Sequence, residues 1–295
     1  MWASVPKVEP AGLGPARSTL SMAVARGYVP TRVCTIVALF GVHREHPLLV
    51  AANRDEFYAR PTAGPTALLE APRTVGGRDL SKGGTWMAVT QGGLVVAVTN
   101  QRSYGVHDAA LRSRGELVLE TARKGSFEAA TAYLRAVDAR DYNAFNLLFG
   151  DARSLAVAYA RRETREVAIE RLDAGTWILA NDRIGSPEFP KTARAAALAA
   201  RLERPSFPSL ADVAHTMLAD HELPPLEKVP PPPHGSHWPH ELLQKLQALC
   251  IHTPAYGTRS STLVAVGEGR VDRYLFADGP PCTTPFVDRT SLLTA

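Results

Sequence analysis

The sequence predicts an α+β fold, a four-layer α/β/β/α sandwich in which two antiparallel sheets pack face to face under outer helices. Three observations lead to this prediction. Short apolar runs recur between turn signals, many are apolar at successive positions, and amphipathic helical segments separate groups of them. Continuous apolarity indicates strands buried on both faces, and hairpin turns indicate antiparallel pairing. Amphipathic helices then supply the covering layers.

The predicted strands follow one another through most of the chain. They span residues 34–40, 47–53, 84–90, 93–100, 145–150, 155–161, 166–172, 177–182, 261–267 and 270–277. A polar loop joins the first pair, and the turns Gly92-Gly93 and Glu268-Gly269 join two later pairs. Such glycine-containing turns between apolar runs are typical of β-hairpins.

The helical pattern occurs between these strands. Apolar residues at three-to-four spacing predict helices in the segments 113–124, 126–140, 191–204 and 209–218. Ser113 and Glu116 match a capping box, and Ser126 is expected to cap the next helix. Residues 223–240, "LPPLEKVPPPPHGSHWPH", are predicted to form a Pro-rich surface loop.

Composition limits the function classes. The 295 residues carry a formal net charge of +4, but Lys and Arg are scattered and no nucleic-acid motif accompanies them. No apolar run reaches the ~18 residues of a membrane span. The cysteines Cys34, Cys250 and Cys282 are too few for a disulfide framework, which favours a reducing compartment. We therefore expect a cytoplasmic protein with no nucleic-acid partner and no membrane span.

Residues 1–33 differ from the rest of the chain because they are rich in Ala, Pro and Gly. We interpret them as a disordered extension, a removable propeptide or the product of a misplaced start codon. Residues 34–295 are then predicted to form a single domain.

Two predicted hairpins bring polar residues together at strand ends. Symmetric pairing of 34–40 with 47–53 places Cys34 opposite Asn53, beside Arg54 and Asp55. In the second hairpin Thr85, which precedes Trp86, would face Asn100. Polar groups at the ends of buried strands are what a functional cleft requires.

These residue types suit nucleophilic catalysis. A cysteine at the start of a chain can use its own α-amino group as general base. The guanidinium of Arg54 would favour the thiolate of Cys34, and Asp55 could hold the α-ammonium. The side-chain amides of Asn100 or Asn181 could donate hydrogen bonds to an oxyanion.

Structural interpretations of the same residues remain open. A lone cysteine in an apolar strand, such as Cys34, is often a small core residue. An Arg-Asp pair at a strand end is often a surface ion pair worth about 0–1 kcal/mol. Asn100, Asn181 and Arg259 could each serve only a turn or a cap.

An ordered set of motifs resembles a known family. The segments are "CTIVALF", "LLVAANRDEFYARP", "GGRDLSKGGTWMAVTQGGLVVAVTNQR", "SRGELV", "ILANDR" and "YGTRSSTLVAV", which run from Cys34 to about Phe276. Together they resemble the NRDE family, named for its Asn-Arg-Asp-Glu motif and also called transport and Golgi organisation protein two-like. That family usually begins Met-Cys-Thr, where this chain has Val33-Cys34-Thr35.

The resemblance implies the fold of N-terminal nucleophile hydrolases and an enzyme that hydrolyses a non-peptide C–N amide bond of a small molecule. In that case Cys34 is the nucleophile. The other residues implied as catalytic are Arg54, Asp55, Asn100, Asn181 and Arg259. Those expected to bind substrate or support the site are Asn53, Glu56, Thr85 and Trp86.

The resemblance also implies a second function, because some members of the family are linked to haem trafficking. The chain would then be a non-enzymatic carrier of haem or another small ligand. The histidines His234, His237 and His240 are evenly spaced in the Pro-rich loop, but this stretch lacks a defined ligand geometry. We therefore expect no metal site and, unless the carrier interpretation holds, no cofactor.

Overall fold

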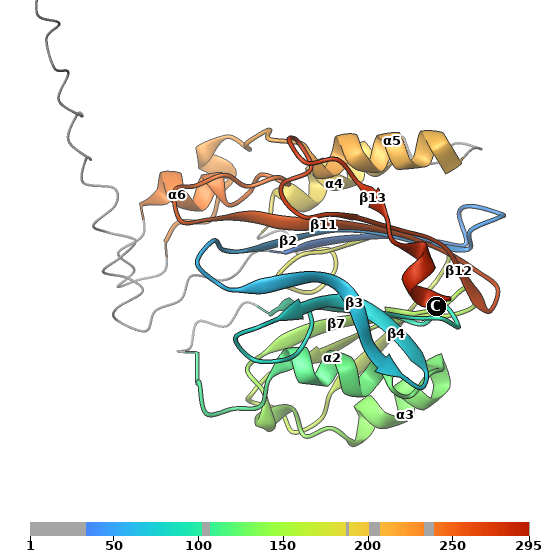
Figure 1. Cartoon of the computed structure of the whole chain (residues 1–295). Helices are drawn as coiled ribbons and strands as arrows, with labels where there is room; N and C mark the ends of the chain where they lie inside the picture. Colours follow the sequence, from blue (N-terminus) through green and yellow to red (C-terminus); the bar gives the residue numbers. More distant parts are fainter. Residues whose placement is uncertain (1–33, 102–106, 187–188, 201–206, 233–238, 295) are drawn as a thin grey trace, which may run out of the picture.

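The computed structural model describes residues 34–101, 107–186, 189–200, 207–232 and 239–294. Residues 1–33, for which we expected an extension or a propeptide, lie outside the described residues. Figure 1 shows four layers in the order helices, sheet, sheet, helices. The predicted α/β/β/α sandwich is therefore confirmed.

The first sheet has six strands in the order β10-β1-β2-β11-β12-β13, all antiparallel neighbours. Its strands are β1 (Thr35–Phe40), β2 (Leu48–Phe57), β10 (Gly175–Leu179), β11 (Tyr256–Gly267), β12 (Arg270–Ala277) and β13 (Val287–Asp288). The second sheet has seven strands in sequential order. They are β3 (Thr62–Glu70), β4 (Arg73–Asp79), β5 (Met87–Thr90), β6 (Val95–Asn100), β7 (Phe145–Gly150), β8 (Leu155–Ala160) and β9 (Ala168–Leu172).

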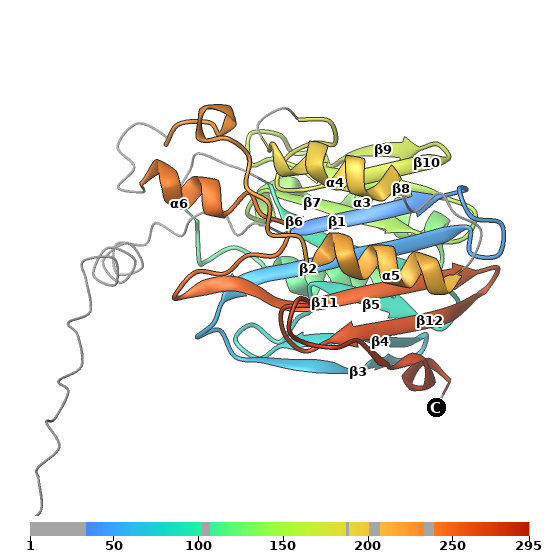
Figure 2. The ribbon, with the colours of Figure 1, turned by 90° about the horizontal axis from the view of Figure 1, so that it is seen from above.

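Helices cover the outer face of each sheet. Those beside the second sheet are α2 (Arg114–Ala122) and α3 (Phe127–Ala136), and those on the side of the first sheet are α4 (Lys191–Ala199), α5 (Phe207–Leu218) and α6 (His240–Lys245). Short 3₁₀ turns are η1 (Ala139–Asp141), η3 (Leu226–Lys228) and η4 (Thr290–Leu293). Seen from above in Figure 2, α4 lies on the side of the sheet formed by β10 and β1, and α5 lies over β2 and β11.

The continuous apolarity of the strands follows from this layering. In β1, Ile36 and Ala38 join the core between the two sheets, whereas Val37 and Leu39 join the core under α4 and α5. Successive side chains of a strand point to opposite faces, so a strand in an inner layer must be apolar on both. A third core lies between the second sheet and α2 and α3.

The first hairpin pairs one residue away from the predicted register. Thr35, rather than Cys34, is paired with Asn53, and Phe40 is paired with Leu48. The cause lies in the turn, where Gly41 has a φ of 65° and its N–H donates to the carbonyl of Pro47 at 2.7 Å. Gly41 adopts this left-handed conformation without strain, so the hairpin gains one more pair.

The second hairpin is also shifted by one residue, but in the opposite direction. Met87 pairs with Ala97, and the N–H of Val98 donates to the carbonyl of Trp86. The turn therefore contains three residues, and it ends at Gly93 with a φ of 90°. This register, in which Met87 faces Ala97 and Trp86 faces Val98, does not bring Thr85 opposite Asn100, so the predicted Thr85–Asn100 pairing is wrong.

The other local predictions agree with the structure in most places. Ser126 caps α3 by accepting a hydrogen bond from the N–H of Ala129 at 3.3 Å. Ser113 stands at the N-cap of α2, but its side chain makes no cap bond, so the predicted capping box does not form. Strands β3 and β4 were not predicted, because β3 is a half-exposed edge strand containing Pro65 and proline is tolerated at such edges.

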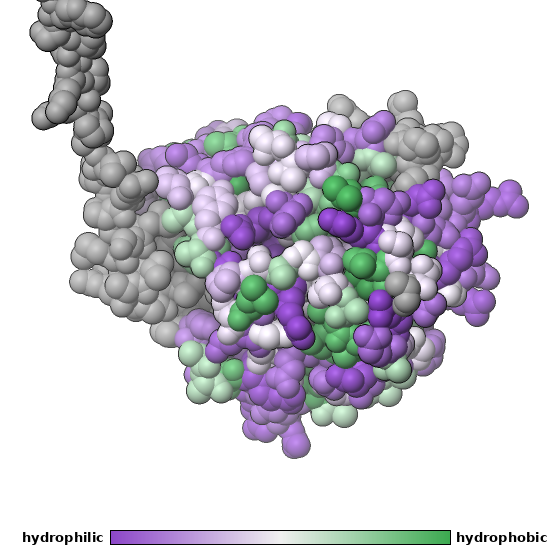
Figure 3. Space-filling view, viewed as in Figure 1, coloured by the Kyte–Doolittle hydropathy of each residue, from purple (hydrophilic) through white to green (hydrophobic). Residues whose placement is uncertain are grey.

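Within the described residues, no helix is long and apolar enough to cross a membrane. In Figure 3 the face shown is largely hydrophilic, and hydrophobic residues form limited patches between hydrophilic ones.

Candidate functional site

Cys34 lies at the end of the first sheet, immediately before β1. Its thiol donates a weak hydrogen bond to the backbone carbonyl of Asp55, with a sulfur–oxygen distance of 3.9 Å. Asp55 and Arg54 belong to the neighbouring strand β2. The first hairpin therefore brings the thiol to the Asn-Arg-Asp-Glu motif, as the sequence predicted.

A cavity of about 150 Å³ opens beside the thiol. The predicted site residues that line it are Cys34, Arg54, Asp55, Glu56, Thr85, Trp86 and Asn100. The first turn of α2 also lines it, because Gly115 packs against the chain before β5. A Cβ on Gly84 would lie 2.4 Å from the carbonyl carbon of Gly115, so glycine is needed for this close approach.

The thiol of Cys34 is protonated at neutral pH in this environment. Burial raises its pKa to about 11, and the charge of Asp55 acts in the same direction. The hydrogen bond to the Asp55 carbonyl and the guanidinium of Arg54 oppose this shift. Because the thiolate is the nucleophile, Cys34 requires a base to react.

Arg54 is held rigidly at the wall of the cavity. Its guanidinium carbon lies 4.2 Å from the ring centroid of Trp86, and Nη2 lies 3.9 Å from Oε2 of Glu56. Burial lowers its pKa, and the charge of Glu56 opposes that effect. Nη1 is buried without a hydrogen-bond partner. Arginine stays charged under these conditions, so this N–H group is available to a ligand.

Asp55 is almost fully buried, and its oxygens have different surroundings. Oδ1 accepts a 2.6 Å hydrogen bond from the hydroxyl of Thr258, whereas Oδ2 has no hydrogen-bond partner. The backbone carbonyl also accepts a 3.1 Å bond from the hydroxyl of Tyr256. Burial raises the pKa of Asp55 to about 7, against the charge of Lys191 and the Thr258 bond.

Lys191 is a site residue that the sequence analysis missed. It is the first residue of α4 and only 1% exposed, and its Nζ has no hydrogen-bond partner. Burial lowers its pKa to about 8, while the charges of Asp55 and Cys34 oppose that shift. A cation in the first turn of a helix is electrostatically unfavourable. The position of a lysine in the first turn of a predicted helix is therefore the local signal that could have indicated that Lys191 is buried near the site.

Asn100 and Asn181 meet, but only Asn100 lines the cavity. The side-chain amide of Asn181 donates a 2.8 Å hydrogen bond to the backbone carbonyl of Asn100. A second bond between the sheets runs from Thr99 Oγ1 to the carbonyl of Ala180 at 2.7 Å. Asn181 therefore holds the end of β6 in position, and the side chain of Asn100 remains the better oxyanion-donor candidate.

Arg259 does not line the cavity. It lies at a β-bulge between Thr258 and Ser260, where the pairing of β11 with β2 shifts register. Its Nη1 donates to the carbonyl of Tyr58 at 3.2 Å, and Nη2 lies 3.5 Å from Thr62 Oγ1. The geometry therefore gives Arg259 an anchoring position on the chain that leads from β2 to β3.

Asn53 also acts as an anchor. Its Nδ2 donates to the carbonyls of Leu218 and Leu249, both at 2.8 Å, and its Oδ1 accepts from Ser261 at 2.5 Å. The side chain thus fixes two segments of the helical layer onto the first sheet. Thr85 is similarly occupied, because its hydroxyl donates to the carbonyl of Met87 at 2.7 Å.

In the described part of the histidine-rich loop, one histidine contacts a backbone carbonyl group of the same loop. His240 Nε2 lies 2.8 Å from the carbonyl oxygen of Val229. His234 and His237 lie outside the described residues, so the expectation that this loop binds neither metal nor haem stays a prediction.

The family profile of Transport and Golgi organisation 2 matches residues 33–274, which is most of the chain. The chain belongs to this family. Curated relatives include the Transport and Golgi organization protein 2 homologs of Bos taurus and Homo sapiens. Each is 30% identical to this chain, over 235 and 234 residues, and each alignment covers 74% of this chain and 82% of the relative.

Solved structures identify the fold to which this family member belongs. Two variants of the conjugated bile acid hydrolase of Clostridium perfringens match with TM-scores of 0.53 and 0.50 at 11% and 10% identity. Both matches cover 88% of this chain and 94% of the hydrolase. The likeness confirms the predicted N-terminal nucleophile hydrolase-like fold.

Proposed function

We propose that the protein is a cysteine amidohydrolase that cleaves a non-peptide C–N amide bond of a small molecule. The observation that carries this proposal is the position of Cys34. Its thiol lines a cavity of about 150 Å³ together with Arg54, Asp55 and Asn100. The proposal includes a mature chain that begins at Cys34, so that the thiol and a free α-amine come from one residue.

The first half of the reaction forms an acyl-enzyme. The α-amine, with an ordinary pKa of about 7.7–8.0, takes the proton of the thiol, whose own pKa of about 11 keeps it protonated otherwise. The sulfur attacks the substrate carbonyl carbon, and a C–S bond forms. The C–N bond then breaks, and the α-ammonium returns its proton to the leaving amine. In this proposal Asp55 Oδ2, which has no hydrogen-bond partner, accepts a hydrogen bond from that ammonium.

The second half consumes water. The α-amine takes a proton from a water molecule, whose oxygen attacks the thioester carbon. The C–S bond breaks, the carboxylic acid leaves, and the thiol regains a proton. In both halves the negative charge on the carbonyl oxygen needs donors, for which the side-chain amide of Asn100 and Arg54 Nη1 are the candidates in the cavity lining.

The decisive experiment tests separately whether the thiol and the free α-amine of Cys34 are needed for the reaction. A chain that begins at Cys34 is compared with a chain carrying one additional alanine before Cys34, and with Cys34→Ala. Each is incubated with p-nitroanilides of short and long carboxylic acids and with a β-lactam. Intact mass reports the acyl adduct and the N-terminus.

The chain with a free Cys34 amine should form the adduct and release p-nitroaniline. The added alanine leaves the thiol but removes its base, so the rate should fall about 10²–10⁴-fold. Cys34→Ala should form no adduct. A chain with a confirmed free Cys34 amine that stays unmodified by every compound would overturn the proposal. The non-enzymatic carrier would then be the hypothesis to pursue, by titration with haem.

A further inference from the structure

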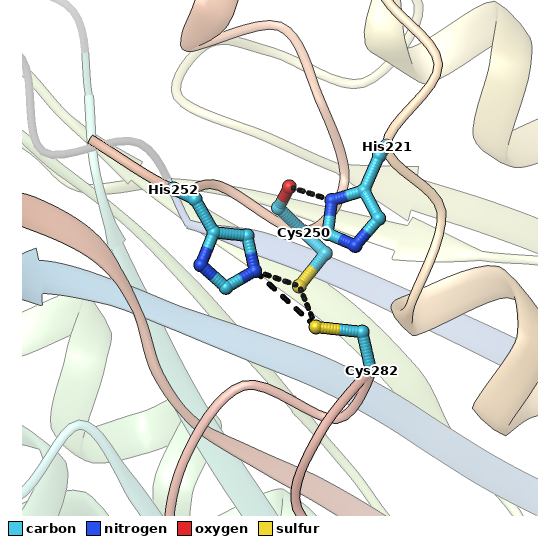
Figure 4. A group of neighbouring side chains, drawn as sticks. All are labelled: His221, Cys250, His252 and Cys282. Atoms are coloured by element: carbon cyan, nitrogen blue, oxygen red, sulfur yellow. Dashed lines mark hydrogen bonds between the residues drawn. The ribbon is translucent and has the colours of Figure 1, made fainter.

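Four metal-ligating side chains converge at a place distinct from the cavity beside Cys34. They come from three separate segments of the helical layer, and they are His221, Cys250, His252 and Cys282. His221 follows α5, Cys250 and His252 precede β11, and Cys282 follows β12. One ligand atom from each residue lies within 4.8 Å of all the others. Figure 4 shows the two imidazoles and the two sulfur atoms facing a common centre.

The distances among Cys250, His252 and Cys282 are those of three ligands of a tetrahedral zinc site. The two sulfurs lie 3.8 Å apart, and His252 Nε2 lies 3.7 Å from the sulfur of Cys250 and 3.2 Å from that of Cys282. A tetrahedral ion with Zn–S of about 2.3 Å and Zn–N of about 2.0 Å separates sulfurs by about 3.8 Å and sulfur from nitrogen by about 3.5 Å. The three separations among Cys250, His252 and Cys282 lie within about 0.3 Å of these values, and the ligand atom of His221 lies within 4.8 Å of each of the other three.

His221 has the outer partner that a metal-bound histidine requires. Its Nδ1 lies 3.0 Å from the backbone carbonyl of Cys250. A carbonyl only accepts, so Nδ1 donates, and Nε2 keeps the lone pair. Metal-binding histidines commonly donate their second ring N–H to a carbonyl in this way, which fixes the tautomer. In Figure 4 this second nitrogen of His221 is directed toward the sulfurs.

The backbone around the cluster is fixed by several hydrogen bonds. The N–H of Cys250 donates to the carbonyl of Asp220 at 2.8 Å, next to His221. His215 of α5 lies 2.9 Å from the carbonyl oxygen of Pro281, next to Cys282. The three segments are therefore tied to one another by groups outside the cluster, so the four side chains meet at a prepared position.

We propose that His221, Cys250, His252 and Cys282 bind one zinc ion. Two thiolates and two imidazoles form a ligand set typical of zinc. All four positions are filled by the protein, so the ion has no open coordination site and serves a structural role. This site was not predicted from the sequence, from which we expected no metal, because its ligands are spread over 62 residues and lack a CxxC spacing.

The zinc site would also stabilise the position of the Asp55 carboxylate beside Cys34. Ile251, between two of the ligands, donates its N–H to Thr258 Oγ1 at 2.9 Å and accepts from the N–H of Thr258 at 2.9 Å. The same hydroxyl donates to Asp55. An ion that holds Cys250 and His252 therefore fixes the loop that presents Thr258 to Asp55.

The test measures the zinc content of the purified full-length protein by elemental mass spectrometry, so it does not depend on the proposed hydrolase activity. About one zinc per chain is expected. Cys282→Ser and His252→Ala should lower the content at least tenfold. Cys34→Ser and His240→Ala, which change the same residue types outside the cluster, should leave it unchanged. Metal-free protein given Co²⁺ should develop the visible bands of tetrahedral cobalt and a sulfur-to-cobalt charge-transfer band.

Replacing one metal-binding side chain by another distinguishes loss of zinc binding from a folding defect. His252→Cys replaces one donor by another, so it should retain zinc and strengthen the charge-transfer band of the Co²⁺ form. Circular dichroism confirms folding for every variant. The proposal is overturned if the folded protein binds no zinc or Co²⁺, or if its zinc survives both single losses. It is also overturned if intact mass shows a stable Cys250–Cys282 disulfide under reducing conditions.

Discussion

Thr258 and Asp55 are joined by a 2.6 Å hydrogen bond between the hydroxyl and Oδ1, within the antiparallel pair formed by β11 and β2. The hydroxyl can donate only one hydrogen bond. It donates to the carboxylate and accepts from the N–H of Ile251. This single side chain therefore connects the carboxylate beside Cys34 with the loop that carries Cys250 and His252.

Thr258→Val should raise the pKa of Asp55 above its value of about 7. The lost bond favours the charged carboxylate, and its removal favours the protonated form. The buried N–H of Ile251 also loses its acceptor, which should cost about 1–3 kcal/mol of unfolding free energy. Carboxyl chemical shifts against pH and urea unfolding report the two effects. Thr258→Ser keeps the hydroxyl, so it should leave both the pKa of Asp55 and the free energy of unfolding nearly unchanged. Equal effects of Thr258→Val and Thr258→Ser would contradict the assigned hydrogen bond.

Asp55 should make stability fall as pH rises between about 4 and 7. The pKa of Asp55 is about 7 in the folded protein, against an ordinary value of 3.8 for an aspartate outside the fold. The folded state therefore holds the proton between these two pH values, and unfolding releases it. The free energy of unfolding then decreases with increasing pH. Urea unfolding at several pH values measures the slope. Asp55→Asn should remove this contribution, and an unchanged slope would show that Asp55 does not titrate there.

Lys191→Met should extend that window upward, because the charge that lowers the pKa of Asp55 is removed. At pH 8 the free energy of unfolding of the variant should therefore still fall with rising pH, whereas in the parent protein Asp55 has largely titrated by then. The double variant Lys191→Met with Asp55→Asn should lose this remaining pH dependence, because the titrating carboxyl group is gone. A double-variant cycle with no coupling would show that the two groups do not interact.

Arg54 and Glu56 should shift the pKa of the Cys34 thiol in opposite directions. Arg54 lowers it and Glu56 raises it, so Arg54→Gln should slow alkylation at a given pH, and Glu56→Gln should accelerate it. The rate of alkylation by iodoacetamide between pH 7 and 10 measures both. Arg112→Gln is the matched control, because Arg112 lines the same cavity, pairs with Glu116 and is not among the charges that shift the pKa of Cys34. Shifts of the same sign in both test variants would contradict the assignment.

The sequence was sufficient for most of the strands, for the layers and for the meeting of Cys34 with Arg54 and Asp55, because these follow from local patterns, but β3 and β4 were missed. The register of each hairpin was missed by one residue, because Gly41 adds a pair to the first hairpin, whereas Gly93 adds a third residue to the turn of the second. Lys191 was missed because its burial depends on α4 packing over the end of the first sheet. Its partner Asp55 lies 136 positions away in the chain, beyond the reach of any local pattern.

Asn53→Ala should destabilise the fold strongly even though Asn53 touches no reacting group. Three buried hydrogen bonds are lost, and the carbonyls of Leu218 and Leu249 lose a donor. At about 1 kcal/mol for each bond, with further cost for buried groups left unsatisfied, the free energy of unfolding should fall by about 3 kcal/mol or more. Urea unfolding measures the change. Asn143→Ala, which removes two bonds to the half-buried backbone of Asp108, should cost less because water can replace its partner. A loss at Asn53 no larger than that at Asn143 would contradict its assignment as the anchor of the helical layer.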